Sequence, residues 1–303
     1  TFTAFGQPEA PPNESLLTLR ARLRAADYDE LTVSKRLGKA PQEIEPTDLP
    51  YLDNFHLGRE PLDDLIRLFL LRGALTEDRA RSLLGSENFD LLLEMSAINN
   101  TQGLCRAEID LFPVENLLVA TDHRYQVLEG DSLTEEPVMY VGRDSVGLVK
   151  TTPRERLESH LDLCTGSGVQ ALVAASYANR VVGVDLNPRA LRFARFNAAL
   201  NGVKNVNFLQ GDLYDPVRGQ RFQSITANPP FVPSPATNLA FRDGGADGEN
   251  ILQRMISQAH LHLERGGRVS IVTDLVDPGS YREKLAGWWQ GPGMCAQILT
   301  TAN

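Results

Sequence analysis

The sequence is poor in the residues that build disulfide frameworks and metal centres. Its 303 residues include three cysteines, Cys105, Cys164 and Cys295, which lie far apart and form no Cys-x-x-Cys pair. An odd number of widely spaced cysteines indicates reduced thiols. The five histidines include His260 and His262, but no third ligand follows them at a metal-like spacing. We therefore expect neither a metal site nor a disulfide-stabilised secreted fold.

Long apolar runs and clustered positive charge are also absent. No run approaches the roughly 20 apolar residues that cross a bilayer, and no leader peptide is visible. We expect a cytoplasmic location and no membrane partner. The net charge of −9 disfavours a broad surface for RNA or DNA, because phosphate binding needs clustered Lys and Arg. An acidic protein can still carry a local basic patch that binds nucleic acid. The chain begins at Thr1 without Met, so truncation stays open, as does the oligomeric state.

Residues 1–122 are predicted to form a mainly helical amino-terminal domain. A helix is predicted from Pro61 to Leu71, and two short helices follow between Thr76 and Met95. Beyond residue 100 the apolar period changes to two, which predicts a hairpin with strands at Cys105–Leu111 and Leu117–Thr121. Three helices followed by a hairpin resemble a winged-helix module, and a generic helical cap over a catalytic domain fits the pattern equally well.

The third helix of this domain argues against DNA reading. A DNA-reading helix at that position would carry basic or amide side chains. Here Glu87, Asp90 and Glu94 occupy it. We expect the domain to hold a protein partner or to pack against the rest of the chain.

The remaining residues divide into a connector and an α/β domain. Residues 123–158 are predicted to form a hairpin-like connector, with strands at Val138–Val141 and Val146–Val149. Over residues 159–303 strands and helices alternate, which predicts a Rossmann-like parallel sheet with helices on both faces. The predicted strands are Leu161–Cys164, Val181–Asp185, Val206–Gln210, Ser224–Ala227, Val269–Thr273 and Cys295–Thr300. The predicted helices are Val169–Tyr177, Pro188–Leu200, Glu249–Leu263 and Tyr281–Trp289.

Thr165, Gly166 and Gly168 lie in the turn between the first of these strands and its helix. Glycine permits a sharp backbone turn and lets a ligand approach the main chain closely. The Gly-x-Gly pattern alone is a weak signal, because dinucleotide-dependent oxidoreductases carry nearly the same sequence. Cys164 is interpreted as a small buried hydrophobe and not as a nucleophile.

Two further acids, Asp185 and Asp212, end the second and third predicted strands. A carboxylate at the end of the second strand can accept hydrogen bonds from both ribose hydroxyls of a nucleoside. Leu186, beside it, is expected to lie against the adenine face. The simpler explanations are a solvated strand end for Asp185 and turn chemistry for Asp212, which follows a glycine.

Asn228, Pro229, Pro230 and Phe231 follow the fourth predicted strand and are the sharpest chemical signal. Two prolines lack N–H groups and fix φ, so the neighbouring carbonyl groups keep one direction. The Asn228 side-chain oxygen and the Pro229 carbonyl can then accept two hydrogen bonds from one NH₂ group. Holding both hydrogens aligns the nitrogen lone pair for attack, and Phe231 can stack on a flat acceptor. A rigid structural turn is the alternative.

The order of these motifs resembles the class I methyltransferases that use S-adenosylmethionine, of the small-domain type. The Asn-Pro-Pro-aromatic motif is similar to the subgroup that methylates planar amide or amino nitrogens. Residues 241–248, Phe-Arg-Asp-Gly-Gly-Ala-Asp-Gly, resemble a loop of release-factor glutamine methyltransferases. The resemblance covers Leu161 to Thr273. The Pro-Arg-x-Glu-Thr signature of those enzymes is absent, and Gly142 to Pro153 stands in its place.

The resemblance implies a site for S-adenosylmethionine and a methyl acceptor. Asp162 would help to position the methionine amino group, and Asp212 with the Leu213 backbone would contact adenine. The implied cofactor-binding residues are Asp162, Thr165, Gly166, Gly168, Asp185, Leu186, Asp212, Leu213 and Asn228. The implied catalytic residues are Asn228, Pro229, Pro230 and Phe231. The seventh strand expected for the class I sheet has no counterpart after the sixth predicted strand.

The leading hypothesis is an S-adenosylmethionine-dependent N-methyltransferase that acts on a protein glutamine, with a partner such as a release factor. The alternative acceptor is the exocyclic amine of adenine or guanine in RNA or DNA. The acidic balance favours a protein, and the missing Pro-Arg-x-Glu-Thr signature favours a nucleobase. A nucleotide-dependent oxidoreductase would explain the glycine loop and Asp185 but would leave the Asn228–Phe231 motif without a role.

Overall fold

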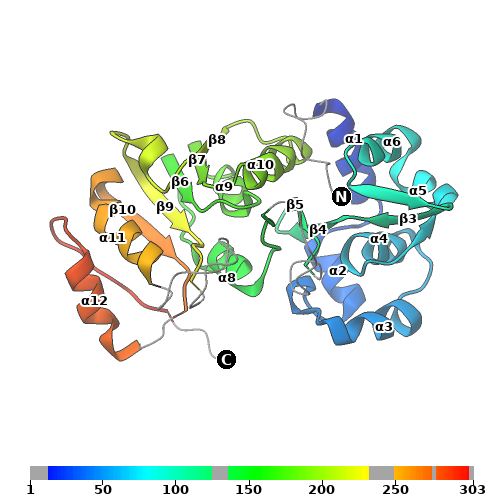
Figure 1. Cartoon of the computed structure of the whole chain (residues 1–303), viewed down its shortest axis with the longest axis horizontal. Coiled ribbons are helices and arrows are strands. Elements are labelled where there is room, and N and C mark those ends of the chain that lie inside the picture. Colours follow the sequence, from blue (N-terminus) through cyan, green and yellow to red (C-terminus); the bar gives the residue numbers. More distant parts are fainter. Residues whose placement is uncertain (1–12, 125–135, 232–248, 275–277, 300–303) are drawn as a thin grey trace.

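The computed structural model describes residues 13–124, 136–231, 249–274 and 278–299. Figure 1 shows two lobes, an amino-terminal lobe in blue and cyan and an α/β lobe from green to red. Strands β4 (Ile109–Val114) and β5 (Leu117–Asp122) and helix α8 (Arg143–Thr151) lie where the two lobes meet. In the described ranges no helix is long and apolar enough to span a bilayer.

The α/β lobe is built on a parallel sheet of five described strands in the order β10-β9-β6-β7-β8. The strands are β6 (Leu157–Leu163), β7 (Ala178–Asp185), β8 (Val206–Gln210), β9 (Phe222–Ala227) and β10 (Leu263–Ile271). Strands that are adjacent in the chain run outward from β6 to β8, and the order then reverses at β9. The first five predicted strands are therefore confirmed, although β6 begins four residues and β10 six residues before the predicted start.

Helices cover both faces of this sheet, as predicted. Leu172 of α9 (Val169–Ala174) and Ala194 of α10 (Pro188–Asn201) share one apolar cluster on one face. Met255 of α11 (Asn250–His262) belongs to a separate cluster on the other face. Helix α12 (Tyr281–Trp288) packs on α11. The chain thus forms the three-layer α/β sandwich that the alternating pattern predicts.

The sixth predicted strand, Cys295–Thr300, is wrong for its described part, residues 295–299, which form no strand. Ile298 and Leu299 are 46% and 66% exposed. A strand is stabilised by a neighbouring strand and a buried face. Residues 295–299 are all exposed, so they lack the buried face.

The predicted hairpin connector is also wrong. Residues 143–151, expected to hold its turn and second strand, form helix α8, and residues 136–142 have no regular structure. Val146 and Val149 are spaced by three residues and are both buried. A short apolar run of this kind cannot be assigned to strand or helix by its period alone.

The amino-terminal lobe has the element order of a winged helix. Helix α4 (Pro61–Leu70) is followed by β1, α5, α6 and the β2–β3 hairpin, and the sheet order is β1-β3-β2. The predicted strand Cys105–Leu111 is wrong as a single strand, because it is divided between β3, which pairs with β1 and β2, and β4, which pairs with β5 in a hairpin as predicted. The bounds of the other elements are α1 (Asn13–Ala25), α2 (Glu30–Leu37), α3 (Leu49–Tyr51), β1 (Leu75–Thr76), α5 (Glu77–Leu84), α6 (Ser86–Glu94), β2 (Ile98–Thr101) and β3 (Leu104–Ala107), with single-turn helices at Pro41–Glu43, Pro46–Asp48, Leu52–His56, Asp215–Val217 and Pro278–Ser280.

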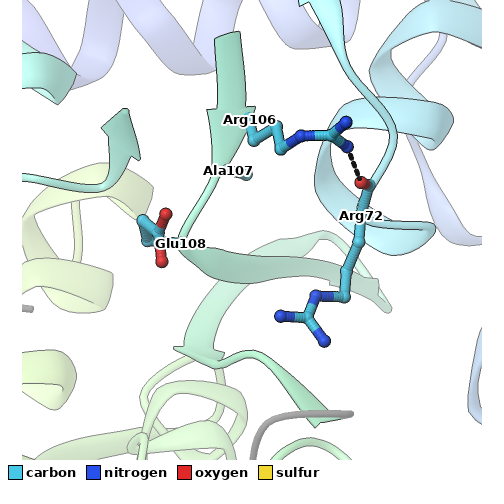
Figure 2. A pocket seen from close by; sticks show the side chains of 4 residues that line it. All are labelled: Arg72, Arg106, Ala107 and Glu108. Atoms are coloured by element: carbon cyan, nitrogen blue, oxygen red, sulfur yellow. Dashed lines mark hydrogen bonds between the residues drawn. The ribbon is translucent and has the colours of Figure 1, made fainter. Parts of the chain in front are cut away.

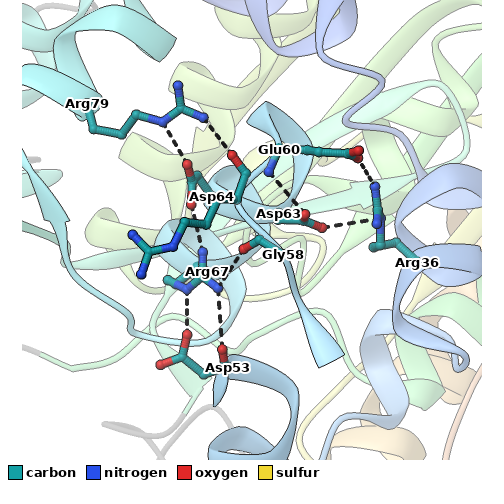
Figure 3. Close-up of polar contacts among 9 residues, drawn as sticks. Arg36, Asp53, Gly58, Glu60, Asp63, Asp64, Arg67 and Arg79 are labelled. Atoms are coloured by element: carbon teal, nitrogen blue, oxygen red, sulfur yellow. Dashed lines mark hydrogen bonds and ion pairs between the residues drawn. The ribbon is translucent and has the colours of Figure 1, made fainter. Parts of the chain in front are cut away.

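Helix α4 carries two acids into the interior of this lobe, and arginines compensate them. Asp64 is 5% exposed and accepts hydrogen bonds from Arg67 Nη1 and Arg79 Nε, each at 2.7 Å. Asp63 is fully buried and lies 3.2 Å from Arg36 Nε. Arg36 belongs to α2, Arg67 to α4 and Arg79 to α5, and Figure 3 shows their side chains around the two acids. Because an unpaired buried carboxylate is costly, the pairs fix how the helices around α4 are arranged.

The two lobes are joined by side chains of α10 that bind the edge of β5. Asn201 accepts from Leu118 N–H (3.0 Å) and donates to the Leu118 carbonyl (2.7 Å). Asn197 makes the same pair with Ala120, at 2.8 and 2.9 Å. Since the two asparagines are four residues apart, they lie on one face of the helix and meet alternate residues of the strand. Together they take the place of a neighbouring β-strand.

A buried ion pair completes this contact. Arg189, in the first turn of α10, donates through both terminal nitrogens to the Asp122 carboxylate at the end of β5. Both side chains are about 95% or more buried. Apolar residues of both lobes also belong to one continuous cluster, which contains Leu19 and Phe193. The hairpin and α10 therefore form one packed unit.

Candidate functional site

The candidate site lies at the carboxyl ends of β6, β7 and β9, where the strand order reverses. The register pairs Leu163 of β6 with Val184 of β7 on one side and with Ala227 of β9 on the other. The residues that follow these three positions therefore meet at one edge of the sheet. In open α/β sheets, ligands bind at this kind of reversal point.

The glycine loop, residues 164–168, makes its turn through left-handed backbone angles. Cys164, Gly166 and Gly168 have φ values of 53°, 52° and 85°. A β-carbon at Gly168 would lie 3.1 Å from Ala194 Cβ and 3.3 Å from Phe208, so this glycine lets the loop pack on α10. A β-carbon at Gly166 would meet no atom of the described residues within 4 Å. The main chain at Gly166 therefore has open space beside it among the described residues.

Asp162 lies beneath this loop and is 1% exposed. Its carboxylate accepts from the hydroxyls of Thr165 (2.5 Å) and Thr226 (2.8 Å) and from the Ala171 N–H (3.2 Å). Burial raises the pKa of Asp162 to about 7, and the hydrogen bonds oppose that shift. These contacts hold the glycine loop on β6 and β9, and contact of Asp162 with a ligand stays a prediction.

His160 extends this buried network. Its Nε2 atom lies 2.9 Å from the Thr226 hydroxyl, which in turn donates to Asp162. Burial lowers the pKa of His160 to about 4, so the ring is neutral at pH 7. Burial also raises the pKa of the Cys164 thiol well above its usual value, which fits the prediction of an inert side chain.

Asp185 connects the end of β7 to the glycine loop. Its two carboxylate oxygens accept from the backbone N–H groups of Gly166 (2.8 Å) and Asn187 (2.9 Å). Burial raises its pKa, and these hydrogen bonds oppose the shift. Leu186, next in the chain, is 65% exposed at the same edge. Asp185 and residues 164–168 together are called the glycine-loop side below.

Asp212 and Leu213 lie at the end of β8. The Asp212 carboxylate pairs with Arg254 of α11 (2.6 Å) and is 43% exposed. The Leu213 side chain is 6% exposed and packs in the core, and its φ is 47°. Asp212 thus has a charged partner within the protein. Contact of Asp212 or Leu213 with adenine stays a prediction.

Asn228 follows β9 directly, and its side chain meets the first turn of α8. The Asn228 Nδ2 atom donates to Asp144 Oδ2 (2.7 Å) and to Ser145 Oγ (3.1 Å). Pro229 is buried, and Pro230 and Phe231 are half-buried. Residues 228–231 with Asp144 and Ser145 are called the Asn228 side below. The predicted loop at residues 241–248 lies outside the described residues.

Sequence reasoning missed three residues of this site. Asp144 and Ser145 were placed in the turn of a hairpin, although an acid in the first turn of a helix was a usable signal. Asn197 fell inside the predicted helix Pro188–Leu200 and was given no role. It donates to the Ser167 carbonyl (2.9 Å) and so ties the glycine loop to the β5 edge.

A separate cavity of about 310 Å³ lies in the amino-terminal lobe, lined by Arg72, Arg106, Ala107 and Glu108 (Figure 2). The Arg106 guanidinium donates to the Arg72 carbonyl at 2.9 Å. Its lining shares no residue with the sheet edge. Across the described ranges, no three His, Cys, Asp or Glu side chains are grouped as metal ligands.

The residues at the sheet edge fit S-adenosylmethionine. An acid at the end of β7 suits ribose hydroxyls, and the open approach at Gly166 suits a ligand that lies on the main chain. A parallel sheet with a glycine loop after its central strand and Asn-Pro-Pro-Phe after β9 defines a class I methyltransferase fold.

The comparisons agree with that class. The family model described as methyltransferase small domain matches residues 143–286. A protein of Methanocaldococcus jannaschii, provisionally named a protein N5-glutamine methyltransferase, is 36% identical over 48% of this chain and 77% of its own length. The chain therefore belongs to the S-adenosylmethionine-dependent methyltransferases of the small-domain family.

Two further relatives share the same core. A release factor glutamine methyltransferase of Thermodesulfovibrio yellowstonii is 37% identical over 36% of this chain and 44% of its own length. A ribosomal protein uL3 glutamine methyltransferase of Bradyrhizobium diazoefficiens is 36% identical over 37% of this chain and 39% of its own length. The chain thus aligns with less than half of these two relatives.

Proposed function

We propose that this protein transfers a methyl group from S-adenosylmethionine to the side-chain amide nitrogen of a glutamine in another protein. The observation that carries the proposal is the position of Asn228 to Phe231 directly after β9, beside the strand that leads into the glycine loop. The relatives described above are named as glutamine methyltransferases of proteins, one of them provisionally, which supports the same acceptor here.

The glycine-loop side would hold the cofactor. Asp185 would accept from the ribose hydroxyls, and the backbone at Gly166 would lie along the ligand. Asp162 would keep the loop in place from below through Thr165 and Thr226. S-adenosylmethionine, when bound, supplies an electrophilic methyl group on a sulfonium sulfur, which keeps the bonding electron pair as the methyl leaves.

The Asn228 side would hold the acceptor. A glutamine amide nitrogen is a poor nucleophile, because its lone pair is delocalised into the carbonyl group. The Asn228 oxygen and the Pro229 carbonyl would accept hydrogen bonds from its two hydrogens and free the lone pair as the nitrogen becomes tetrahedral. Phe231 would lie on the flat amide. One of the two protons is lost to solvent once the nitrogen–carbon bond has formed.

The test is a methylation assay with labelled S-adenosylmethionine and a mixture of ribosomes, ribosomal proteins and release factors. We expect the label in protein, at a glutamine that mass spectrometry identifies from one added methyl group. Label in RNA would overturn the protein acceptor and support the exocyclic amine of a nucleobase. A protein that binds a nicotinamide dinucleotide and no S-adenosylmethionine would overturn methyl transfer itself.

A further inference from the structure

Asn228 can present either its oxygen or its NH₂ group to an acceptor, and only one of these supports the chemistry. The acceptor nitrogen carries hydrogens and needs a hydrogen-bond acceptor beside it. If the amide of Asn228 were turned over, two donors would face each other and the contact would be repulsive. The direction of this one amide therefore matters as much as its position.

We propose that Asp144 and Ser145, at the start of α8, are positioning residues that hold Asn228 with its oxygen toward the acceptor. The inference rests on the function proposed above. Both hydrogens of the Asn228 NH₂ group have a partner, since Nδ2 donates to Asp144 Oδ2 at 2.7 Å and to Ser145 Oγ at 3.1 Å. An ionised carboxylate can only accept, so the group that faces Asp144 must be the NH₂. The oxygen is then directed away from α8.

The surroundings of Asp144 keep its carboxylate in this place. A β-carbon at Gly142 would overlap with Asp144 Oδ1, so the carboxylate occupies space that only glycine leaves open. The carboxylate lies in the first turn of α8, where exposed N–H groups and the helix dipole favour negative charge. Gln170 of α9 donates to the Ser145 carbonyl at 2.8 Å and is buried. The turn is therefore fixed to the helix that begins at the glycine loop.

This contact lies in the segment that stands in the place of the Pro-Arg-x-Glu-Thr signature. The sequence here is Gly142-Arg143-Asp144-Ser145. As in the signature, an acid and then a hydroxyl residue follow an arginine. Here the acid follows the arginine directly, whereas one residue separates them in the signature.

The test compares single and double variants by kcat, KM and cofactor affinity. For Asp144→Ala we expect kcat to fall about 10- to 100-fold, the scale of one lost charge-assisted hydrogen bond, with cofactor affinity and Tm close to wild type. Ser145→Ala should show a smaller fall. Asp215→Ala is the matched control, because that exposed acid pairs only with Arg218 among the described residues. This variant should leave kcat, KM and cofactor affinity unchanged.

A double-mutant cycle separates orientation from simple support of α8. If Asp144 acts through Asn228, then Asp144→Ala should cause no further loss of kcat in an Asn228→Ala background. Additive losses would overturn the proposal. The exchanged pair is a second test: Asn228→Asp alone places two carboxylates together, and adding Asp144→Asn should restore at least part of the lost turnover. No recovery in the double variant would count against the proposal.

The outcomes also separate this inference from the proposed function. If wild type methylates a protein glutamine and Asp144→Ala turns over normally, only the inference fails. If wild type labels RNA, the protein acceptor fails, and the same kcat ratio on RNA still decides the role of Asp144. One readout needs no acceptor: the side-chain NH₂ protons of Asn228 should exchange slowly with solvent in wild type and rapidly in Asp144→Ala. Equal exchange rates would overturn the inference.

Discussion

The two sides of the sheet edge are held in different ways. On the glycine-loop side, most contacts are local or come from adjacent strands, with one from Asn197 of α10, and each oxygen of Asp185 accepts from a backbone N–H group. On the Asn228 side, the key amide is oriented by two side chains that lie 83 and 84 residues earlier in the chain. The first arrangement is fixed mainly by the strand-loop-helix unit and the elements directly around it, and the second depends on where α8 packs. Variants on the two sides should therefore fail differently.

The largest expected effect is on the Asn228 side. Asn228→Ala should lower kcat by about 10² to 10³, or about 3–4 kcal/mol, because one preorganised oxygen beside the reacting nitrogen is lost. Cofactor affinity, measured by calorimetry, should stay nearly unchanged. Near-normal turnover on the true acceptor would reduce Asn228 to Phe231 to a structural turn.

The next effect concerns pH and the buried acid beneath the glycine loop. The folded-state pKa of Asp162 is raised to about 7, above its unfolded value of 3.8, so the folded state holds the proton more tightly. Its contribution to stability is complete below pH 3.8 and is lost as pH rises through about 7. Between these values stability should fall by up to about 1.4 kcal/mol per pH unit from this group, or about 2–3 kcal/mol from pH 5 to 7.

Asp162→Asn should remove that slope. Denaturant titration from pH 5 to 8 measures the free energy of unfolding of the variant and of the wild type. The quantity to compare is the difference between the two at each pH. The variant carries a constant cost, since Ala171 N–H and the two threonine hydroxyls can no longer all find an acceptor. A difference that stays constant over this range would show that Asp162 does not titrate there.

Asp185→Ala should weaken S-adenosylmethionine binding by about 1.5–3 kcal/mol, the scale of a hydrogen bond to a charged group. The turnover of the fully loaded enzyme should change much less, because the acceptor contacts are intact. A calorimetric Kd equal to wild type would remove Asp185 from the cofactor site.

The two loop glycines give a matched pair of smaller effects. Alanine costs about 1–2 kcal/mol of stability in the left-handed region at either position. Gly168→Ala would place a methyl group 3.1 Å from Ala194 Cβ, which is unfavourably close, so its Tm should fall further. A β-carbon at Gly166 has no neighbouring atom among the described residues, so Gly166→Ala should instead lose more cofactor affinity than stability. The reverse order in thermal melts and binding assays would place the ligand elsewhere.

The smallest effect is expected at Phe231. Loss of an aromatic contact costs about 0.5–1.5 kcal/mol, so Phe231→Ala should raise KM for the acceptor roughly 2- to 10-fold with kcat little changed. Phe231→Tyr should behave as wild type, because the flat face is kept. A fall in kcat without a change in KM would indicate that the ring acts on the transition state instead.

The same difference between the two sides decides what sequence could predict. The strands, the glycine loop and Asp185 were predictable, because apolar runs ending in turn residues and acids are local patterns. Helix α8 was not, because Val146 to Val149 fits a strand as well as a helix. Its contact with Asn228 depends on tertiary packing, which no local period records. The roles of Asn197 and Asn201 were hidden for the same reason, since an asparagine in a helix gives no sign that it will bind a strand.

The asparagine pair on α10 also bears on how the folded chain behaves at high concentration. The edge of a β-strand is a template on which a strand of another molecule can add, and such growth leads to aggregation. On the β5 edge, the N–H and carbonyl groups of Leu118 and Ala120 are already bonded to Asn197 and Asn201. No foreign strand can add there while α10 is docked. The two amides that join the lobes therefore also guard the chain against self-association through this hairpin.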